Sequence, residues 1–274
     1  SKGDPNISCL MIVHNFDPVL INLGFLSIRW YSLAYIFGIF FGVYWGKYLI
    51  KKNFSNANLS EQNLDDYVVW AVLGIIFGGR LGYVFFYDFS FYLSNLAEIV
   101  KVWNGGMSFH GGLIGIVISS FVFSKKNKIS FWSLTDVLAC ISPIGIFLGR
   151  ISNFINGELV GKATDVSWSF IFPNYDQIAR HPSQLYEALL EGLLLFLIMN
   201  SLVKRLSEKN GYLSIVFLMS YSFFRIIAEI FREPDQHLGY LYFGLSMGTL
   251  LSLLTIFFGS FFIIWKSKND FRKN

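Results

Sequence analysis

The sequence predicts an all-α polytopic membrane protein. Only 15% of its 274 residues are charged, against about 25% in ordinary soluble domains. Hydrophobic residues make up 54% of the chain, and they recur in runs long enough to cross a bilayer as helices. No polar segment is long enough to bury a core of its own. We therefore expect residues 1–274 to form a single integral membrane domain.

Apolar runs of sufficient length occur about seven times along the chain. A transmembrane helix needs about 20 predominantly apolar residues. The longest polar stretch, residues 151–181, separates the fourth run from the fifth, and we expect it to form a small extracytoplasmic head. The expected spans are residues 30–49, 67–86, 109–124, 133–150, 183–203, 212–231 and 241–265.

Basic residues predict how these spans are oriented. Thirteen lysines and arginines gather beside alternate span ends, mostly in short clusters. Because cytoplasmic loops carry an excess of lysine and arginine, this side is expected to face the cytoplasm, with the N-terminus outside and the C-terminus inside. The thirteen are Lys47, Lys51, Lys52, Lys125, Lys126, Lys128, Lys204, Arg205, Lys209, Lys266, Lys268, Arg272 and Lys273.

The opposite span ends carry arginine where topology disfavours it. An arginine at mid-membrane costs about 2.5–3.5 kcal/mol on insertion scales, so several together indicate a polar cavity that opens outward. The guanidinium donates hydrogen bonds in pairs, so these arginines are suited to bind a phosphate or carboxylate ligand. We favour this interpretation over the alternative, in which each arginine side chain only extends to the membrane interface. These residues are Arg29, Arg80, Arg150, Arg180, Arg225 and Arg232.

Residues 149–161 form the densest polar motif of the chain, at the end of the fourth span. If the helix continues past Arg150, Asn153 lies on the same face one turn later. The glycines of the motif allow another backbone to approach closely. A helix end that is merely capped by polar residues is the alternative. The candidate binding residues here are Arg150, Asn153, Asn156, Glu158 and Gly161.

Two further candidates lie at the outer ends of other spans. His110 begins the third span beside two glycines, where a histidine is more often a hydrogen-bonded structural residue. Tyr31 follows Arg29 and Trp30 and is equally suited to anchor the helix at the interface, as tyrosine commonly does.

The fifth and sixth spans add charged residues at helical spacing. Arg225, Glu229 and Arg232 stand at i, i+4 and i+7, which places them on one helical face. Glu229 is expected either to bind substrate or simply to neutralise these arginines. The fifth helix begins at Pro182 and carries Glu187 and Glu191, with one face directed at the cavity.

Composition excludes several classes of function. The net charge of +4 reflects the basic residues around the membrane, so nucleic acid binding is not expected. Cys9 in the N-terminal tail and Cys140 inside a span form neither a disulfide framework nor a zinc site. No phosphate-cradling P-loop occurs, and we expect no metal or other cofactor. The N-terminus also lacks the pattern of a cleaved signal peptide.

Four blocks of sequence resemble the bacterial prolipoprotein diacylglyceryl transferases. The resemblance covers nearly the whole chain, from residues 17–19 to the seventh span, although Ser152 stands where the family usually has glycine or alanine. The blocks are FHGGLIG at residues 109–115, GRxxNFINGExxG at 149–161, RHPSQLYE at 180–187 and RxxxExxRxPD at 225–235.

The resemblance implies transfer of a diacylglyceryl group from phosphatidylglycerol to the lipobox cysteine of a prolipoprotein signal peptide. A thioether forms and glycerol phosphate leaves, at the outer face of the bacterial inner membrane. We expect the enzyme to work as a monomer. The functional residues of the family fall on Tyr31, His110, Arg150, Asn153, Glu158, Gly161, Arg225 and Glu229.

The residues themselves suit this chemistry. A free thiol has a pKa of about 8.5 and needs a base or a positive field near neutrality. His110, with an ordinary pKa of about 6.5, can accept the thiol proton. Arg150 and Arg225 can stabilise the negative charge that grows on the leaving phosphate.

Two other functions remain open at this level. A transporter of anionic solutes would also line a cavity with arginines, although the chain has no internal repeat and the arginines stop at one membrane face. A haem-binding membrane protein fits the sequence less well. His110, His181 and His237 all lie on one side of the membrane, with no histidine partner on the other side.

Overall fold

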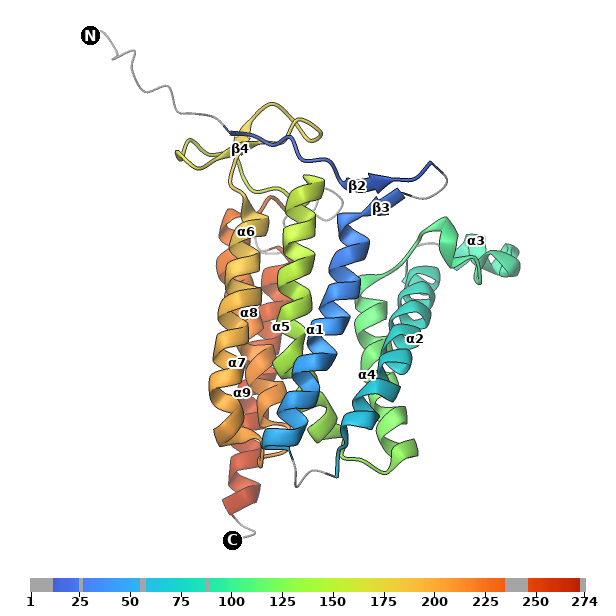
Figure 1. The fold of residues 1–274 in the computed structure, drawn as a ribbon, viewed down its shortest axis with the longest axis vertical. Helices are drawn as coiled ribbons and strands as arrows, with labels where there is room; N and C mark the ends of the chain where they lie inside the picture. Colours follow the sequence, from blue (N-terminus) through green and yellow to red (C-terminus); the bar gives the residue numbers. More distant parts are fainter. Residues whose placement is uncertain (1–11, 25–26, 55–57, 87–88, 235–245, 272–274) are drawn as a thin grey trace, which may run out of the picture. The chain divides into compact units, whose positions relative to one another are not determined.

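The computed structural model describes residues 12–24, 27–54, 58–86, 89–234 and 246–271, and this part of the chain is mostly helical (Figure 1). Six of its helices are long and apolar enough to cross a membrane, which confirms the polytopic all-α class. These helices are α1 (Trp30–Asn53), α2 (Glu61–Phe86), α5 (Phe131–Asn156), the continuous helix Ser183–Leu206, α8 (Tyr212–Phe231) and most of α9 (Met247–Phe271).

The third predicted span forms helix α4 (Phe109–Asn127), which is not among these six. It has only 19 residues, and it carries His110 at one end and Lys125 and Lys126 at the other, so its uninterrupted apolar part is short. Ser108 caps its start by accepting a hydrogen bond from the backbone N–H of Gly111. The count of seven spans stays a prediction.

The chain divides into two compact units, one of residues 1–42, 139–204 and 212–274 and the other of residues 43–138 and 205–211. In the second unit, α2 packs closely against α4 because both present glycines at four-residue spacing. A Cβ atom added at Gly82 would lie 2.7 Å from the Cα of Gly111, closer than real side chains permit. Gly74 and Gly78 meet Gly115 in the same way. Small residues at this spacing let transmembrane helices approach backbone to backbone.

The second unit also contains the loop between α2 and α4. This loop folds as a short helix, α3 (Phe89–Ser94), followed by two single turns, η1 (Leu96–Glu98) and η2 (Val102–Asn104). The backbone N–H of Ser108 donates to the carbonyl of Gly79 on α2, which ties the end of the loop to that helix.

In the first unit, the fifth predicted span is a composite helix. It begins as α6 (Ser183–Glu187), widens into the π-helical turn η3 (Ala188–Leu194) and continues as α7 (Leu195–Leu206). Helix α8 contacts α6, η3 and α9. A π turn inserts one extra residue into a helix and is frequent at functional sites.

The fourth predicted span runs further than expected. Helix α5 continues six residues past Arg150 and ends at Asn156, before Gly157, whose φ of 67° suits the end of a helix. The head therefore begins after Asn156. It contains a three-stranded sheet in the order β1 (Ile12–Val13), β4 (Phe170–Ile171) and β5 (Ala179–Arg180), with β1 parallel to β4.

A small aromatic core joins this sheet to the end of α5. Phe154 and Phe172 pack with Val160, and His14 hydrogen-bonds the carbonyl of Phe154 through Nε2 at 2.6 Å. Nearer to α1, the strands β2 (Val19–Asn22) and β3 (Ser27–Arg29) form an antiparallel pair that leads directly into that helix.

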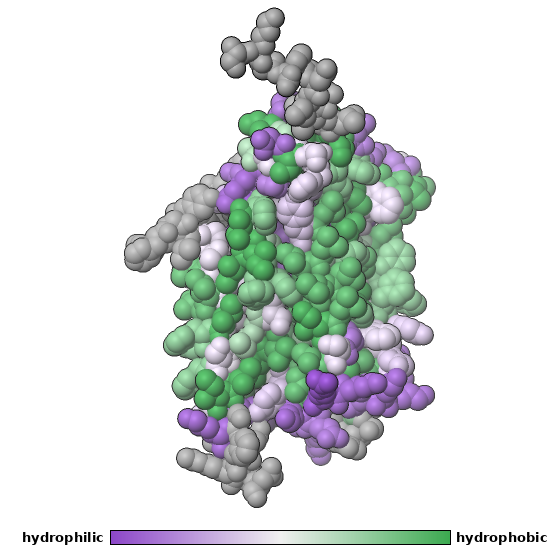
Figure 2. All heavy atoms as spheres, turned by 90° about the vertical axis from the view of Figure 1, so that its left-hand side faces the viewer, coloured by the Kyte–Doolittle hydropathy of each residue, from purple (hydrophilic) through white to green (hydrophobic). Residues whose placement is uncertain are grey.

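Apolar side chains dominate the face of the molecule that Figure 2 shows, and hydrophilic residues gather at its two ends. A soluble protein rarely exposes so large an apolar surface, whereas the lipid-facing surface of a membrane protein is expected to be apolar. The exposed apolar residues of α7, α8 and α9 include Leu197, Leu218, Phe223, Ile230, Leu254, Phe257, Phe258, Phe261 and Ile264.

Candidate active site

Three arginines and three glutamates from three helical segments meet in the first unit. We call this set the arginine–glutamate cluster: Arg150 on α5, Glu187 and Glu191 on α6 and η3, and Arg225, Glu229 and Arg232 on and just after α8. The helical spacings i, i+4 and i+7 place the α8 residues on one face, and i, i+4 aligns the two glutamates.

Arg150 binds both glutamates of the fifth span. Its Nη1 lies 2.8 Å from Glu187 Oε2, and its Nη2 lies 3.0 Å from Glu191 Oε2. One guanidinium fork thus joins two carboxylates that are one helical turn apart. This arrangement depends on α5 continuing past the glycine at 149 as a regular helix.

Arg225 and Arg232 complete the cluster. Arg225 forms an ion pair with Glu229 one turn later and lies 3.4 Å from Glu187 Oε2. Arg232 Nη1 donates to both oxygens of Glu187, at 3.0 and 3.3 Å. Glu229 also accepts a hydrogen bond from Ser246 at 2.8 Å. Glu187 therefore contacts all three arginines.

The cluster is buried and its formal charges balance. The side chains of Glu187 and Glu191 are 1% and 0% exposed, while those of Arg150 and Arg225 are 17% and 14% exposed. Removing an ion from water is costly unless it is paired, which explains why each arginine has a carboxylate partner. The two arginines that the sequence assigned to phosphate binding are also the more accessible members.

Two polar atoms of the cluster lack a hydrogen-bond partner among the described residues. They are Arg225 Nη1 and Glu191 Oε1, which lie 3.5 Å apart without forming a hydrogen bond. Buried polar atoms are nearly always hydrogen-bonded, so each exception calls for a physical reason. A guanidinium nitrogen that makes ion pairs but no hydrogen bond is a ready binding point for an anion.

The motif at the end of α5 forms a second polar group in the same unit. Asn153 and Asn156 both donate to Glu158 Oε1, at 2.8 and 3.4 Å, and Gln184 donates to the Glu158 carbonyl. The Asn156 Oδ1 and Gln184 Oε1 atoms are buried without a partner among the described residues. Their amide groups are thus only partly used within the protein.

Gly161 is required by the close approach of two other segments. It pairs with Arg232 as an antiparallel bridge, and its N–H donates to the carbonyl of His181 at 3.1 Å. A Cβ atom added here would lie 2.7 Å from the Cβ of His181 and 2.8 Å from the carbonyl oxygen of Phe231. Any side chain at this position would displace the end of α8, which is followed directly by Arg232 of the cluster.

Tyr31 is half-buried in the first turn of α1 and packs edge-to-face against Tyr35, with ring centroids 5.2 Å apart. Tyr35 lies within electrostatic reach of Glu158, so this aromatic pair belongs to the surroundings of the α5 motif. A second tyrosine, Tyr221 on α8, interacts electrostatically with Glu191, Arg150 and Arg225. The sequence did not indicate Tyr221, because it stands among apolar residues of the sixth span.

The remaining predicted residues, His110 and Arg80, belong to the second unit. His110 is the second residue of α4 and is exposed, with its ring against Phe109. Arg80 is 4% exposed and donates to the carbonyls of Glu98, Ile99, Gly105 and Gly106. The guanidinium thus clamps the loop between α2 and α4. A role of Arg80 in substrate binding stays a prediction.

Arg180 is held in the head and not in the cluster. It forms a two-pronged ion pair with Asp176, at 2.6 Å for Nη2 and 3.0 Å for Nε, and also contacts Glu233 and the carbonyl of Gly161. These hydrogen bonds from Arg180 lower the pKa of Asp176 below its ordinary value. Burial lowers the pKa of His181, which contacts the Tyr186 hydroxyl at 3.2 Å.

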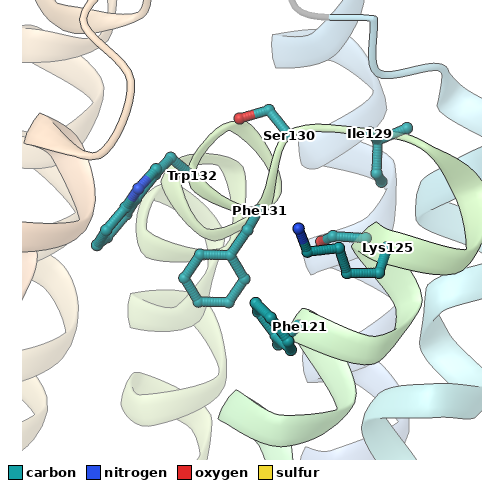
Figure 3. A pocket seen from close by; sticks show the side chains of 7 residues that line it. Phe121, Lys125, Ile129, Ser130, Phe131 and Trp132 are labelled. Carbon is teal, nitrogen blue, oxygen red and sulfur yellow. The ribbon is translucent and has the colours of Figure 1, made fainter.

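A hollow of about 510 Å³ lies in the second unit at the turn between α4 and α5. Figure 3 shows Lys125 on one side of it and Trp132 on the other, with Phe121 and Phe131 between them. None of the predicted site residues lines this hollow. Of the two cysteines, Cys140 is buried in α5, and Cys9 lies outside the described residues, as do Asp235 and His237.

Comparison with known proteins identifies the family of the chain. A family model described as prolipoprotein diacylglyceryl transferase matches residues 18–265. Two proteins named phosphatidylglycerol–prolipoprotein diacylglyceryl transferase are each 47% identical to this chain. The match to the protein from Rickettsia bellii (strain OSU 85-389) covers 93% of this chain and 97% of the relative. The match to the protein from Rickettsia felis covers 92% of this chain and 98% of the relative. The protein of that name from Allorhizobium ampelinum is 45% identical over 92% of this chain and 90% of its own length. The chain therefore belongs to the prolipoprotein diacylglyceryl transferase family.

Proposed function

We propose that this protein transfers the diacylglyceryl group of phosphatidylglycerol to the lipobox cysteine of prolipoproteins, the first step of lipoprotein maturation. The observation that carries the proposal is the buried arginine–glutamate cluster, in which Arg150 and Arg225 are the more accessible arginines. A phosphodiester headgroup is the kind of anion that paired guanidinium donors bind best.

The reaction exchanges one bond at the glycerol carbon for another. The cysteine sulfur forms a bond to that carbon, and the bond from the carbon to the phosphate oxygen breaks. The electron pair leaves with glycerol phosphate, and the thiol loses its proton to a base. Sulfur is supplied by the substrate, so Cys140, buried in α5, needs no catalytic role.

Arg150 and Arg225 bind the phosphate and stabilise the charge that develops as it leaves. Donors aimed at such a charge typically contribute about a hundred- to a thousandfold in rate each. Glu229 holds the guanidinium group of Arg225 in place through their ion pair. Arg232 likewise holds the carboxylate of Glu187. Arg80 adds positive potential in the second unit while it clamps its loop.

The α5 motif positions the glycerol headgroup. Asn153 and Asn156 present amides that Glu158 orients, and the Asn156 oxygen has hydrogen-bonding capacity left for a hydroxyl group. Gly161 keeps the backbone of the head close to the end of α8. Tyr31 offers a phenol at the entrance of α1, where aromatic side chains commonly meet lipid headgroups.

His110 serves as the general base for the substrate thiol. Its position at the start of α4 leaves the imidazole exposed, so a thiol can reach it. We place seven spans in the bacterial inner membrane, with the N-terminus and the head that follows Asn156 outside and the C-terminus in the cytoplasm. The chain acts as one integral membrane domain, as a monomer and without a cofactor.

A direct assay tests the proposal. The full-length protein is reconstituted with phosphatidylglycerol labelled in its acyl chains and incubated with a peptide that contains a lipobox cysteine. Label is expected to move to the peptide, with one glycerol phosphate released for each lipidated peptide. A peptide with serine in place of that cysteine is the matched control. Transfer of a solute or lipid across the bilayer without peptide labelling would contradict the proposal.

A further inference from the structure

The three glutamates of the cluster are not equivalent. Glu187 accepts hydrogen bonds on both oxygens from Arg232, and its Oε2 also forms an ion pair with Arg150. Glu229 also uses both oxygens, one for Arg225 and one for Ser246. Glu191 accepts a hydrogen bond only on Oε2, from Arg150, while its Oε1 lies 3.5 Å from Arg225 Nη1 as an ion pair without a hydrogen bond. Glu191 is therefore the least firmly held carboxylate of the three.

Glu191 Oε1 faces Arg225 Nη1, and neither atom takes part in a hydrogen bond among the described residues. These two atoms lie 3.5 Å apart but are oriented so that no hydrogen bond forms. The other charged or titratable groups that act on Glu191 are Arg150 from α5, Glu187 one turn earlier and Tyr221 from α8. The carboxylate thus lies between the two arginines assigned to the phosphate.

Charge balance limits how a phosphate can enter. The cluster already pairs three cations with three anions, and a phosphodiester brings one further negative charge. Adding it to a buried neutral cluster would leave one carboxylate without a counter-ion, which is costly where water is scarce. The charges balance again if the phosphate replaces one carboxylate in its ion pairs with arginine and that carboxylate becomes protonated.

We infer that Glu191 is the exchangeable counter-ion of this site: the headgroup phosphate displaces it from Arg150 and Arg225, and the displaced carboxylate takes up one proton from solvent. The inference rests on the proposed function and adds a positioning residue to it. In the absence of lipid, Glu191 keeps the two guanidinium groups paired. The π-helical turn η3 contains Glu191, and π turns inside helices are frequent at functional sites.

Binding of a soluble headgroup tests the inference without the transfer reaction. The probe is glycerophosphoglycerol, the deacylated headgroup of phosphatidylglycerol, which keeps a single negative charge near neutral pH. Isothermal titration calorimetry of the full-length protein, in buffers of different ionisation enthalpy, gives the affinity and the number of protons taken up. For the wild-type protein we expect about one proton for each headgroup bound.

Two variants separate a counter-ion from a merely structural residue. Glu191→Gln removes the charge and keeps the shape, so the probe is expected to bind about tenfold tighter or more, because a competing negative charge is gone. Proton uptake is expected to disappear in this variant. Glu191→Asp keeps a titratable carboxyl and is expected to retain the uptake. Glu208→Gln, on an exposed glutamate of the second unit, is the matched control.

The outcomes distinguish this inference from the proposed function. Unchanged or weaker binding in Glu191→Gln overturns it, and so does wild-type binding without proton uptake. The second result is decisive even if Glu191→Gln does not fold. If the wild-type protein labels the peptide but takes up no proton, the counter-ion role is wrong and the transferase activity stands. If the wild-type protein labels no peptide, the proposed function itself fails.

Discussion

Arg225 and Arg80 are both buried near the ends of apolar helices, yet the chain satisfies them in different ways. Arg225 is paired with carboxylates of Glu229, Glu187 and Glu191. Arg80 donates to four backbone carbonyls of the loop between α2 and α4. A carboxylate can be exchanged for another anion, whereas a carbonyl is fixed in the chain. We therefore expect Arg225 to bind the ligand and Arg80 to hold its loop.

His110, which belongs to the second unit like Arg80, provides the largest expected effect. If it removes the thiol proton, His110→Gln should lower turnover by about a hundred- to ten-thousandfold. Raising the pH should partly restore activity, because more of the substrate thiol ionises without help. The measurement is the pH–rate profile with a lipobox peptide and phosphatidylglycerol. Wild-type turnover with an unchanged profile would rule out the base role.

Replacing the carboxylate-paired arginines by lysine is expected to have the next largest effect. Arg150→Lys and Arg225→Lys keep the charge but lose the two-pronged donation, so kcat/KM should fall about a hundredfold or more. Steady-state kinetics with phosphatidylglycerol measures this, and circular dichroism checks that the helices are intact. Near-normal turnover in both variants would mean that positive potential alone suffices.

Arg80→Lys should act mainly on stability. Lysine cannot reach the four carbonyls at once, and buried acceptors left without a donor cost about 1–3 kcal/mol. We expect a lower unfolding temperature and faster proteolysis within residues 96–106, with a smaller loss of kcat/KM than for Arg225→Lys. A raised KM for phosphatidylglycerol at unchanged stability would instead assign Arg80 to the substrate.

The Asp176–Arg180 pair is the third kind of arginine partner, a carboxylate in contact with water, and has the smallest expected effect. Because Arg180 lowers the folded-state pKa of Asp176, the pair stabilises the head above the ordinary pKa of aspartate, about 3.9. That contribution is lost as the pH falls through the lower folded-state pKa. Asp176→Asn should cost about 1 kcal/mol or less at pH 7. Thermal unfolding at pH 7 and pH 3 should show the difference from wild type shrinking in acid, and an equal difference at both values would contradict this.

The sequence predicted the helical parts of the site well. The spacing of Arg225, Glu229 and Arg232 was sufficient to place them on one face, because helical geometry is local. The end of α5 was predicted less well: the predicted span ended at Arg150, and only the condition that the helix continues placed Asn153 on the same face, whereas the helix runs to Asn156.

Contacts between segments distant in sequence were not predictable in the same way. The pairing of Glu187 and Glu191 with Arg150 depends on how two helices pack, about 40 residues apart, and no periodicity specifies it. The parallel pairing of β1 with β4 rests on two-residue strands separated by more than 150 residues. Loop carbonyls, such as those that hold Arg80, carry no signal in the side-chain pattern.

The most direct test of the central claim is an experimental structure of the protein with phosphatidylglycerol bound. We predict that the headgroup phosphate lies within hydrogen-bond distance of the guanidinium groups of Arg150 and Arg225, with Glu191 moved away from both and the contacts of Arg80 unchanged. A phosphate bound elsewhere, with the ion pairs of Arg150 to Glu187 and Glu191 intact, would contradict it.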